Sequence, residues 1–258
     1  MKDLKLLNTN QLKYIALVFM AMDSAFFSFP GLPSWIHLIT RFVAPLFAYL
    51  TVEGFFHTRN RQKHLLRLWS AAILMQLGDW LSLFLLGETY QIRDNIFLTL
   101  AVGYSAIYFW QKAKDKENQR TVNAIIGTII FLVGLIGIPL GPLPIILEGG
   151  IPILFLMLIF WAFYSNPKKQ LLVFGVWSLI SFFLFGPDLN ISHYPSLSIW
   201  FDMFCYNSDA LSFLFLPFLL FYNGKKGSSK PIHKWFFYIF YPAHLWILHL
   251  LAFWFQVK

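Results

Sequence analysis

The sequence predicts an all-α fold, a polytopic transmembrane helical bundle of about nine spanning helices that forms a single integral membrane domain over residues 1–258. Three observations indicate this class. Hydrophobic residues make up 58% of the chain and charged residues only 12%, about half the charged share usual for a soluble domain. The apolar residues gather in runs long enough to cross a bilayer. The basic residues lie in short segments between those runs.

The basic segments give the predicted orientation. Seventeen of the 20 Lys and Arg residues fall in five segments, whereas the alternate connections carry only Arg93. Because Lys and Arg are translocated unfavourably, the basic segments are expected on the cytoplasmic side. An odd number of spans then places the N-terminus in the cytoplasm and the C-terminus outside. The five segments are Lys2–Lys13, Arg59–Arg67, Lys112–Arg120, Lys168–Lys169 and Lys225–Lys234.

Each predicted span has about 17–25 residues, the length that a hydrocarbon core of about 30 Å requires. A Gly-Pro-Leu-Pro sequence at 141–144 predicts a tight outer turn. The eighth span carries Asp202, Asn207 and Asp209, which could break it. The spans are expected at 11–29, 34–56, 64–87, 94–111, 121–139, 143–164, 170–186, 197–222 and 235–256.

Several classes of protein are disfavoured by composition. The net charge of +8 could suggest nucleic-acid binding, but the basic residues lie between spans and are expected to face anionic lipid instead. The partners expected are therefore the lipid bilayer and no nucleic acid. The single cysteine, Cys205, cannot form an internal disulfide, and no Cys/His spacing resembles a zinc site. The first apolar run lacks a small-x-small cleavage site, so no cleaved signal peptide is expected.

Ionisable residues inside the spans are the candidate functional positions, because an unpaired charge within a bilayer is unfavourable. Counted at about 1.5 Å per residue, most lie in the extracytoplasmic half, which is consistent with a cavity that opens outward. His244 is the exception, because it lies near the middle of the last span and not in its extracytoplasmic half. The others are Asp23, Arg41, Asp79, Arg93, Asp94, Glu148 and Asp202, and the polar but neutral Asn95 is added to them because it follows Arg93 and Asp94.

These positions also have structural interpretations. Asp23 and Arg41 share a depth and have opposite signs, so they could form an ion pair with no catalytic role. Pro45 and Pro242 are expected to kink the second and ninth spans and free backbone carbonyls. His244 follows such a kink and can act as a base near neutral pH, although a buried histidine can equally serve as a hydrogen-bonding structural residue.

Four strings of sequence occur in an order and at depths that resemble a known family. They are Leu12-Lys-Tyr-Ile-Ala-Leu-Val-Phe-Met-Ala-Met-Asp23; Arg41-Phe-Val-Ala-Pro-Leu-Phe-Ala-Tyr-Leu-Thr-Val-Glu-Gly54 with the following basic segment; Asn95-Ile-Phe-Leu-Thr-Leu100; and Phe240-Tyr-Pro-Ala-His-Leu245. Together they resemble the TraX family of multi-pass membrane acyltransferase-like proteins. Residues 120–230 resemble the family in hydropathy alone.

The resemblance implies transfer of an acyl group, most simply acetyl, from cytoplasmic acetyl-CoA to an extracytoplasmic amine or hydroxyl. The founding member of the family acetylates the N-terminus of conjugative pilin. A peptide or another envelope component is therefore the expected acceptor, and the bacterial cytoplasmic membrane the expected location. Many members of the family carry Asp-His where this chain has Asp23-Ser24. If that histidine is the family's general base, this chain needs another base or has lost the activity.

A mechanism follows as a hypothesis from the resemblance and the residues. Acyl transfer needs a base for the acceptor's proton and donors for the developing oxyanion. His244 is assigned as the base, with Asp23 orienting it. Arg41 and Asn95 are expected to bind the oxyanion or an anionic acceptor. Arg59, Arg61 and Arg67 are expected to hold the phosphates of coenzyme A, unless they are simply solvated loop residues.

Two other functions fit the same sequence. A small-molecule or lipid transporter or flippase would also use kinked helices and buried charges, although no internal repeat is visible. A non-catalytic membrane partner protein that retains the acyltransferase fold would account for Ser24.

Overall fold

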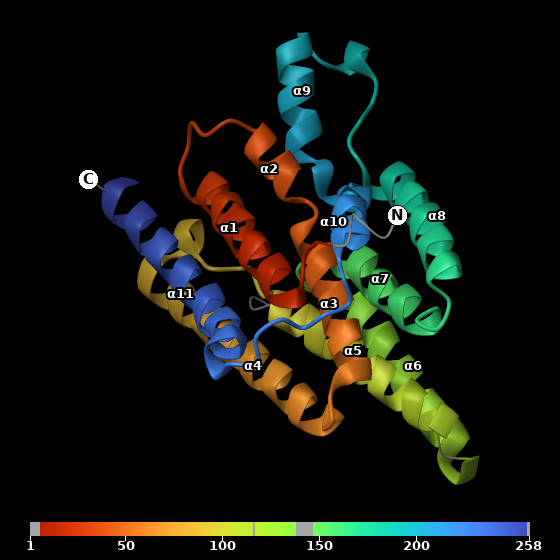
Figure 1. Ribbon diagram of the computed structural model, residues 1–258. Helices are drawn as coiled ribbons and strands as arrows, with labels where there is room; N and C mark the ends of the chain where they lie inside the picture. The colour runs from red at the N-terminus through yellow and green to blue at the C-terminus, as the bar shows by residue number, and fades with distance from the viewer. Residues whose placement is uncertain (1–5, 116, 138–146, 257–258) are drawn as a thin grey trace. The chain divides into compact units, whose positions relative to one another are not determined.

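The structure is a computed structural model that describes residues 6–115, 117–137 and 147–256 (Figure 1). The described residues are helical or irregular, and their only β-type pairing is an isolated bridge between Leu7 and Tyr222. The all-α class predicted from the sequence is therefore confirmed. The chain divides into two compact units. Three of their boundaries fall within helices α3 (Val43–His57), α4 (Arg61–Leu86) and α8 (Pro167–Phe185), and the fourth falls between residues 92 and 93, outside any helix.

The first unit contains residues 1–46, 85–92 and 175–258. Its complete helices are α1 (Thr9–Ser28), α2 (Trp35–Thr40), α9 (Leu197–Tyr206), α10 (Leu216–Phe221) and α11 (Pro231–Gln256). Helix α1 lies against both α2 and α11, and α2 also packs on α9 (Figure 1). A short 3-10 helix, Glu88–Tyr90, packs on α11.

Helix α1 begins at a capping box. The Asn8 side chain accepts a hydrogen bond from the Gln11 backbone N–H at 3.1 Å, and the Gln11 side chain accepts one from the Asn8 N–H at 3.0 Å. This reciprocal pair satisfies two of the backbone donors that the first turn of a helix leaves free. The capping box thereby fixes the residue at which α1 begins.

The second predicted span, 34–56, is interrupted. Helix α2 ends at Thr40, and α3 (Val43–His57) begins two residues after Arg41. Pro45 explains the interruption, because it has no N–H to donate to the carbonyl of Arg41 four residues earlier. The proline expected to kink this span thus separates two helices and leaves Arg41 at the junction.

The break that the polar residues of the span predicted over 197–222 could cause is present. The segment consists of α9, the 3-10 helices Ser208–Ala210 and Ser212–Phe215, and then α10. The Asn207 side chain donates back to the Met203 carbonyl at 2.9 Å, an alternative to the helical bond that this residue type favours at helix ends. Asp209 follows and pairs with Arg41, so the polar residues end the helix where the sequence placed them.

The second unit contains residues 47–84 and 93–174. Its centre is α5 (Ile96–Asp115), which packs against α6 (Arg120–Ile136) and α7 (Gly150–Ala162). Gly127 on α6 permits a close approach, because a Cβ atom there would lie 3.0 Å from the Ala106 carbonyl oxygen of α5. Small residues at such positions are the usual means by which membrane helices pack closely.

Among the described residues, five helices are long and apolar enough to cross a membrane. They expose large apolar side chains, for example Leu74 and Phe84 on α4 (Arg61–Leu86) and Ile136 on α6, as lipid-facing helices do. The count of about nine spans is not confirmed. The predicted turn at 141–144 lies outside the described residues. The five are Trp35–His57, which comprises α2 and α3 with the interruption at Arg41, Arg61–Leu86, Glu117–Ile136, Pro167–Phe185, which is α8, and Trp235–Phe255.

Candidate functional site

The first unit brings together a cluster of charged side chains around Asp23 of α1. One carboxylate oxygen, Oδ1, lies 2.7 Å from His37 Nδ1 and accepts a hydrogen bond from the Thr40 hydroxyl at 2.7 Å. The other, Oδ2, accepts from the Arg41 guanidinium at 2.5 Å. Thr40 and Arg41 follow His37 by three and four residues, so α2 and the helical residue that caps its end, Arg41, present all three on one face. The ion pair of Asp23 with Arg41 expected from their shared depth is confirmed.

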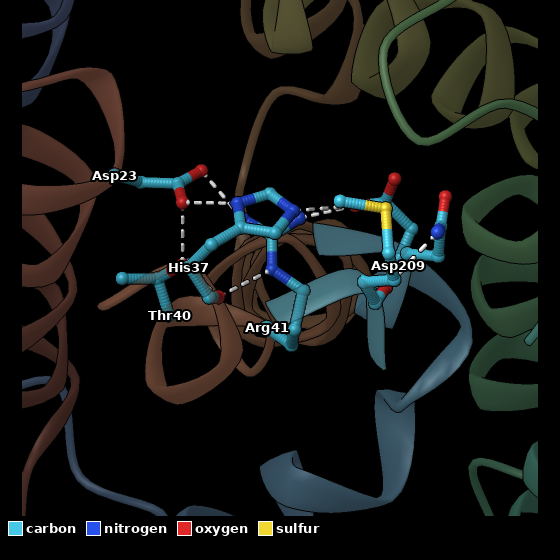
Figure 2. Close-up of polar contacts among 7 residues, drawn as sticks. Asp23, His37, Thr40, Arg41 and Asp209 are labelled. Carbon is cyan, nitrogen blue, oxygen red and sulfur yellow. Dashed lines mark hydrogen bonds and ion pairs between the residues drawn. The ribbon is translucent and has the colours of Figure 1, made fainter. Parts of the chain in front are cut away.

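Arg41 joins Asp23 to a second carboxylate, Asp209, which is distant in the sequence. Its guanidinium contacts Asp209 Oδ1, and its Nε donates to the His37 carbonyl at 2.9 Å. Figure 2 shows Asp23 on one side of His37 and Asp209 on the other. Asp209 is 73% exposed, whereas the His37 side chain is only 2% exposed. The cluster is therefore exposed at Asp209, whereas the imidazole, including its Nε2 atom, is buried.

His37 has the geometry of an oriented imidazole. Asp23 is an acceptor when ionised, so in the neutral imidazole the hydrogen bond assigns the ring proton to Nδ1 and the lone pair to Nε2. Within the described part of the chain, Nε2 makes no hydrogen bond, and Asp209 Oδ1 lies 3.7 Å away. The rings of Phe26 and Phe27 pack on the imidazole at centroid distances of 5.6 and 4.8 Å. A base held by a carboxylate, with its other nitrogen unbonded, is the arrangement that general-base catalysis uses.

His244 occupies a different environment. Its Nε2 lies 3.2 Å from the Ser24 hydroxyl, and its Nδ1 lies 3.0 Å from the Phe240 carbonyl oxygen. The structure thus pairs His244 with Ser24, and the carboxylate expected to orient it, Asp23, contacts His37 instead. Adjacent residues on an α-helix point about 100° apart. The Asp23 side chain consequently faces α2, whereas Ser24 faces α11.

Asn95 belongs to the second unit, where its side chain has two backbone partners. The amide donates to the Ala72 carbonyl at 3.0 Å, and the amide oxygen accepts from the Leu98 N–H at 3.2 Å. The second contact caps the start of α5. These bonds give Asn95 a structural role in its own unit.

The three arginines assigned to coenzyme A differ in their surroundings. Arg59 is exposed. Arg61 lies over the Phe55 ring at 4.4 Å and 3.6 Å from Asp115, so its charge has partners within the chain. Arg67 has a buried Nε without a hydrogen bond among the described residues. Arg67 is therefore the one of the three whose contacts leave a buried donor for an anion.

Reasoning from the sequence missed His37. The available signal was its spacing, because a histidine four residues before an intramembrane arginine shares that arginine's helical face. His37 lies near the outer end of the span predicted over 34–56 and has no other distinguishing feature in the sequence. Its importance follows from the position of Asp23 on a neighbouring helix.

Long apolar helices with exposed apolar faces and a partly buried charge cluster define a multi-pass membrane protein. The sequence model of one family, described as TraX protein, matches residues 8–252, and the chain belongs to the TraX family. It is also similar to a protein of Dichelobacter nodosus named "Probable fimbrial assembly protein FimC, serogroup H1". The two are 28% identical over 250 residues, which cover 92% of this chain and 93% of the relative. No solved structure matches the chain.

Proposed function

We propose that this chain is an integral membrane acyltransferase that moves an acyl group, most simply acetyl, from cytoplasmic acyl-CoA to an extracytoplasmic amine or hydroxyl. The observation that carries the proposal is the 2.7 Å contact of Asp23 with His37, whose Nε2 has no hydrogen bond among the described residues. Membership of the TraX family supports the same reaction class, because the family includes a pilin acetylase.

In this mechanism His37 replaces the histidine that many family members carry beside the aspartate. His37 Nε2 accepts the proton of the acceptor's amine or hydroxyl as that group attacks the thioester carbonyl. Asp23 stabilises the resulting imidazolium. The new C–N or C–O bond forms as the C–S bond breaks, and His37 returns its proton to the departing thiolate. The products are the acylated acceptor and free coenzyme A, and no further reactant is needed.

Arg41 and Asp209 supply the charges around the base. The Arg41 guanidinium can stabilise negative charge on the reacting carbonyl oxygen, a role in which preorganised donors are most effective. Asp209 is exposed and lies 3.7 Å from His37 Nε2, so its carboxylate can attract a cationic acceptor to the base. This charge favours an amine, such as a peptide N-terminus, over a neutral hydroxyl.

The test is acyl transfer in proteoliposomes with acetyl-CoA labelled in its acetyl group and an envelope fraction as the source of acceptor. His37→Gln should abolish labelling, because glutamine cannot accept a proton and return it. His244→Gln is the matched control and should retain most labelling. Full activity in His37→Gln, with activity lost in His244→Gln, would instead assign the base to His244.

The proposal includes the topology derived from the basic segments. The N-terminus is placed in the cytoplasm and the C-terminus outside, with about nine crossings of the membrane. Single cysteines introduced at exposed Lys168 and exposed Ser192, in a Cys205→Ser background, should be labelled from opposite sides of sealed vesicles. Labelling of both from one side would contradict this topology.

A second function is favoured by one specific observation. The relative at 28% identity is named a fimbrial assembly protein, which is compatible with a non-catalytic membrane partner in surface assembly. In that case the cluster of Asp23, Arg41 and Asp209 serves only to hold α1, α2 and the segment after α9 together. His37→Gln would then leave assembly of the surface structure unchanged as long as the protein folds.

A further inference from the structure

The connection between α10 and α11 is closely fitted to the first turn of α1, in the first unit. In Figure 1 this segment passes the beginning of α1. The Leu7 N–H donates to the Phe221 carbonyl at 3.0 Å, and the Asn223 N–H donates to the Leu7 carbonyl at 2.9 Å. The Thr9 N–H donates to the Lys225 carbonyl at 2.9 Å. We refer to residues 223–230 as the basic loop.

Side chains and a glycine complete the fit. The Asn10 amide donates to the Ser228 carbonyl at 2.8 Å, and the Lys225 N–H donates to the Asn223 side chain at 2.8 Å. Gly227 has φ +81°, and a Cβ atom there would lie 2.6 Å from Asn8 Oδ1. Only glycine adopts this conformation without strain at so close an approach. The loop is therefore held in one defined conformation.

This arrangement brings several lysines together, and none of the carboxylates that the structure describes pairs with them. The basic loop carries Lys225, Lys226 and Lys230, and Lys13 lies in the second turn of α1. Lys13 is partly buried, with its ammonium 6.0 Å from the centre of the Phe237 ring, and its charge interacts repulsively with that of Lys226. In the described part of the chain, no ion pair joins any of these four lysines to an acidic residue. Neighbouring like charges are unfavourable unless an anion binds between them.

We propose that the basic loop and Lys13 form a binding site for phosphate groups. Lysine ammonium groups bind phosphate as point charges, and an ordered loop lowers the entropy lost when a ligand binds. The preference of Lys for the cytoplasmic side accounts for the positive charge of the loop. This preference does not account for the hydrogen bonds and the glycine that fit the loop to α1.

Two sources of phosphate share this chemistry: coenzyme A and the headgroup of an anionic phospholipid. The first source rests on the proposed function. Lys13 and Asp23 lie ten residues apart on α1, which corresponds to about 15 Å along the helix and is comparable with the length of an extended pantetheine arm. A phosphate bound near Lys13 would therefore leave the thioester within reach of His37.

The experiment measures binding of coenzyme A by calorimetry to the full chain in nanodiscs of phosphatidylcholine. Lys13→Gln and Lys226→Gln should each weaken binding about tenfold, the effect of losing one charge-assisted contact. Lys168→Gln is the matched control, because it removes an exposed lysine at the start of α8, and it should bind normally. Gly227→Ala keeps every charge but displaces the loop, and it should also weaken binding. Size-exclusion profiles and thermal melts establish that each variant is folded.

A second arm uses nanodiscs that contain phosphatidylglycerol and counts retained lipid by native mass spectrometry. Loss of retained phosphatidylglycerol in Lys13→Gln and Gly227→Ala, without coenzyme A binding in any variant, assigns the site to the lipid headgroup. The proposal is overturned if the wild type binds neither ligand. It is also overturned if Lys168→Gln weakens binding as much as Lys13→Gln, or if Gly227→Ala has no effect.

The same variants distinguish failure of the phosphate site from failure of the proposed acyltransferase function. Acyl transfer with an unchanged KM for acetyl-CoA in Lys13→Gln would remove the coenzyme A assignment and leave the acyltransferase intact. Lysine-dependent coenzyme A binding without any transfer would keep the phosphate site and remove the acyltransferase.

Discussion

Replacing Asp23 with asparagine tests both the structural and the catalytic role of the cluster. The substitution keeps the size of the side chain but removes its charge. In the structure the carboxylate receives contacts from His37 at 2.7 Å, Thr40 at 2.7 Å and Arg41 at 2.5 Å. An amide can accept from Thr40 or Arg41 but no longer neutralises the guanidinium.

The loss of stability is expected to be about 3 kcal/mol, the lower end of the range for breaking a buried ion pair. The lower end applies because Asp23 is 25% exposed and because Asp209 still contacts Arg41. Chemical unfolding in detergent measures this free energy. Ser24→Ala is the neighbouring control and should cost about 1 kcal/mol, because it removes one neutral hydrogen bond to His244.

The loss of activity is expected to be larger than the loss of stability alone would produce. Asparagine can donate its amide N–H to His37 Nδ1, which moves the ring proton to Nε2 and removes the basic lone pair. Losing a general base typically lowers the rate about 10²–10⁴-fold. Labelled acetyl transfer by folded Asp23→Asn should fall in that range, whereas Ser24→Ala should keep its rate. A folded Asp23→Asn protein with undiminished transfer would falsify the assignment of His37 as an oriented base.

Three further predictions concern other parts of the chain. Asp209→Asn should change the free energy of unfolding by less than about 1 kcal/mol, because this carboxylate is 73% exposed, but it should raise KM for amine acceptors in the transfer assay; an unchanged KM would remove its acceptor-binding role. Gly127→Val should destabilise the protein by about 1–3 kcal/mol, because its side chain would enter the 3.0 Å approach to the Ala106 carbonyl; equal unfolding midpoints for the two proteins would contradict this packing. In the exposed connection before α9, a backbone N–H and the His193 side chain hold the pKa of Asp188 below its usual value. This loop is therefore stabilised at pH values above the ordinary carboxyl pKa and loses that stabilisation as the pH falls through the lowered pKa. Over that fall in pH, hydrogen exchange of the loop amides should accelerate relative to unstructured peptides, and Asp188→Asn should remove this acid-dependent step.

The helices were predictable from the sequence because hydropathy is a local property. The apolar runs at 64–87, 121–139, 170–186 and 235–256 correspond to α4, α6, α8 and α11 with shifts of a few residues at their ends. The interruption at Arg41 was also encoded locally, because Pro45 removes a specific backbone donor. The pairing of Asp23 with Arg41 was one of the alternatives that their shared depth and opposite signs indicated, and the structure contains it.

The partners of those charges required the tertiary structure. Asp209 reaches Arg41 from 168 residues away, and no local pattern specifies such a contact. The choice between His37 and His244 depends on the rotation of α1, which points Asp23 toward α2 and Ser24 toward α11. A one-dimensional sequence gives the depth of each residue along its helix. The direction in which a side chain points is decided by how neighbouring helices pack, and this direction determines which histidine Asp23 orients.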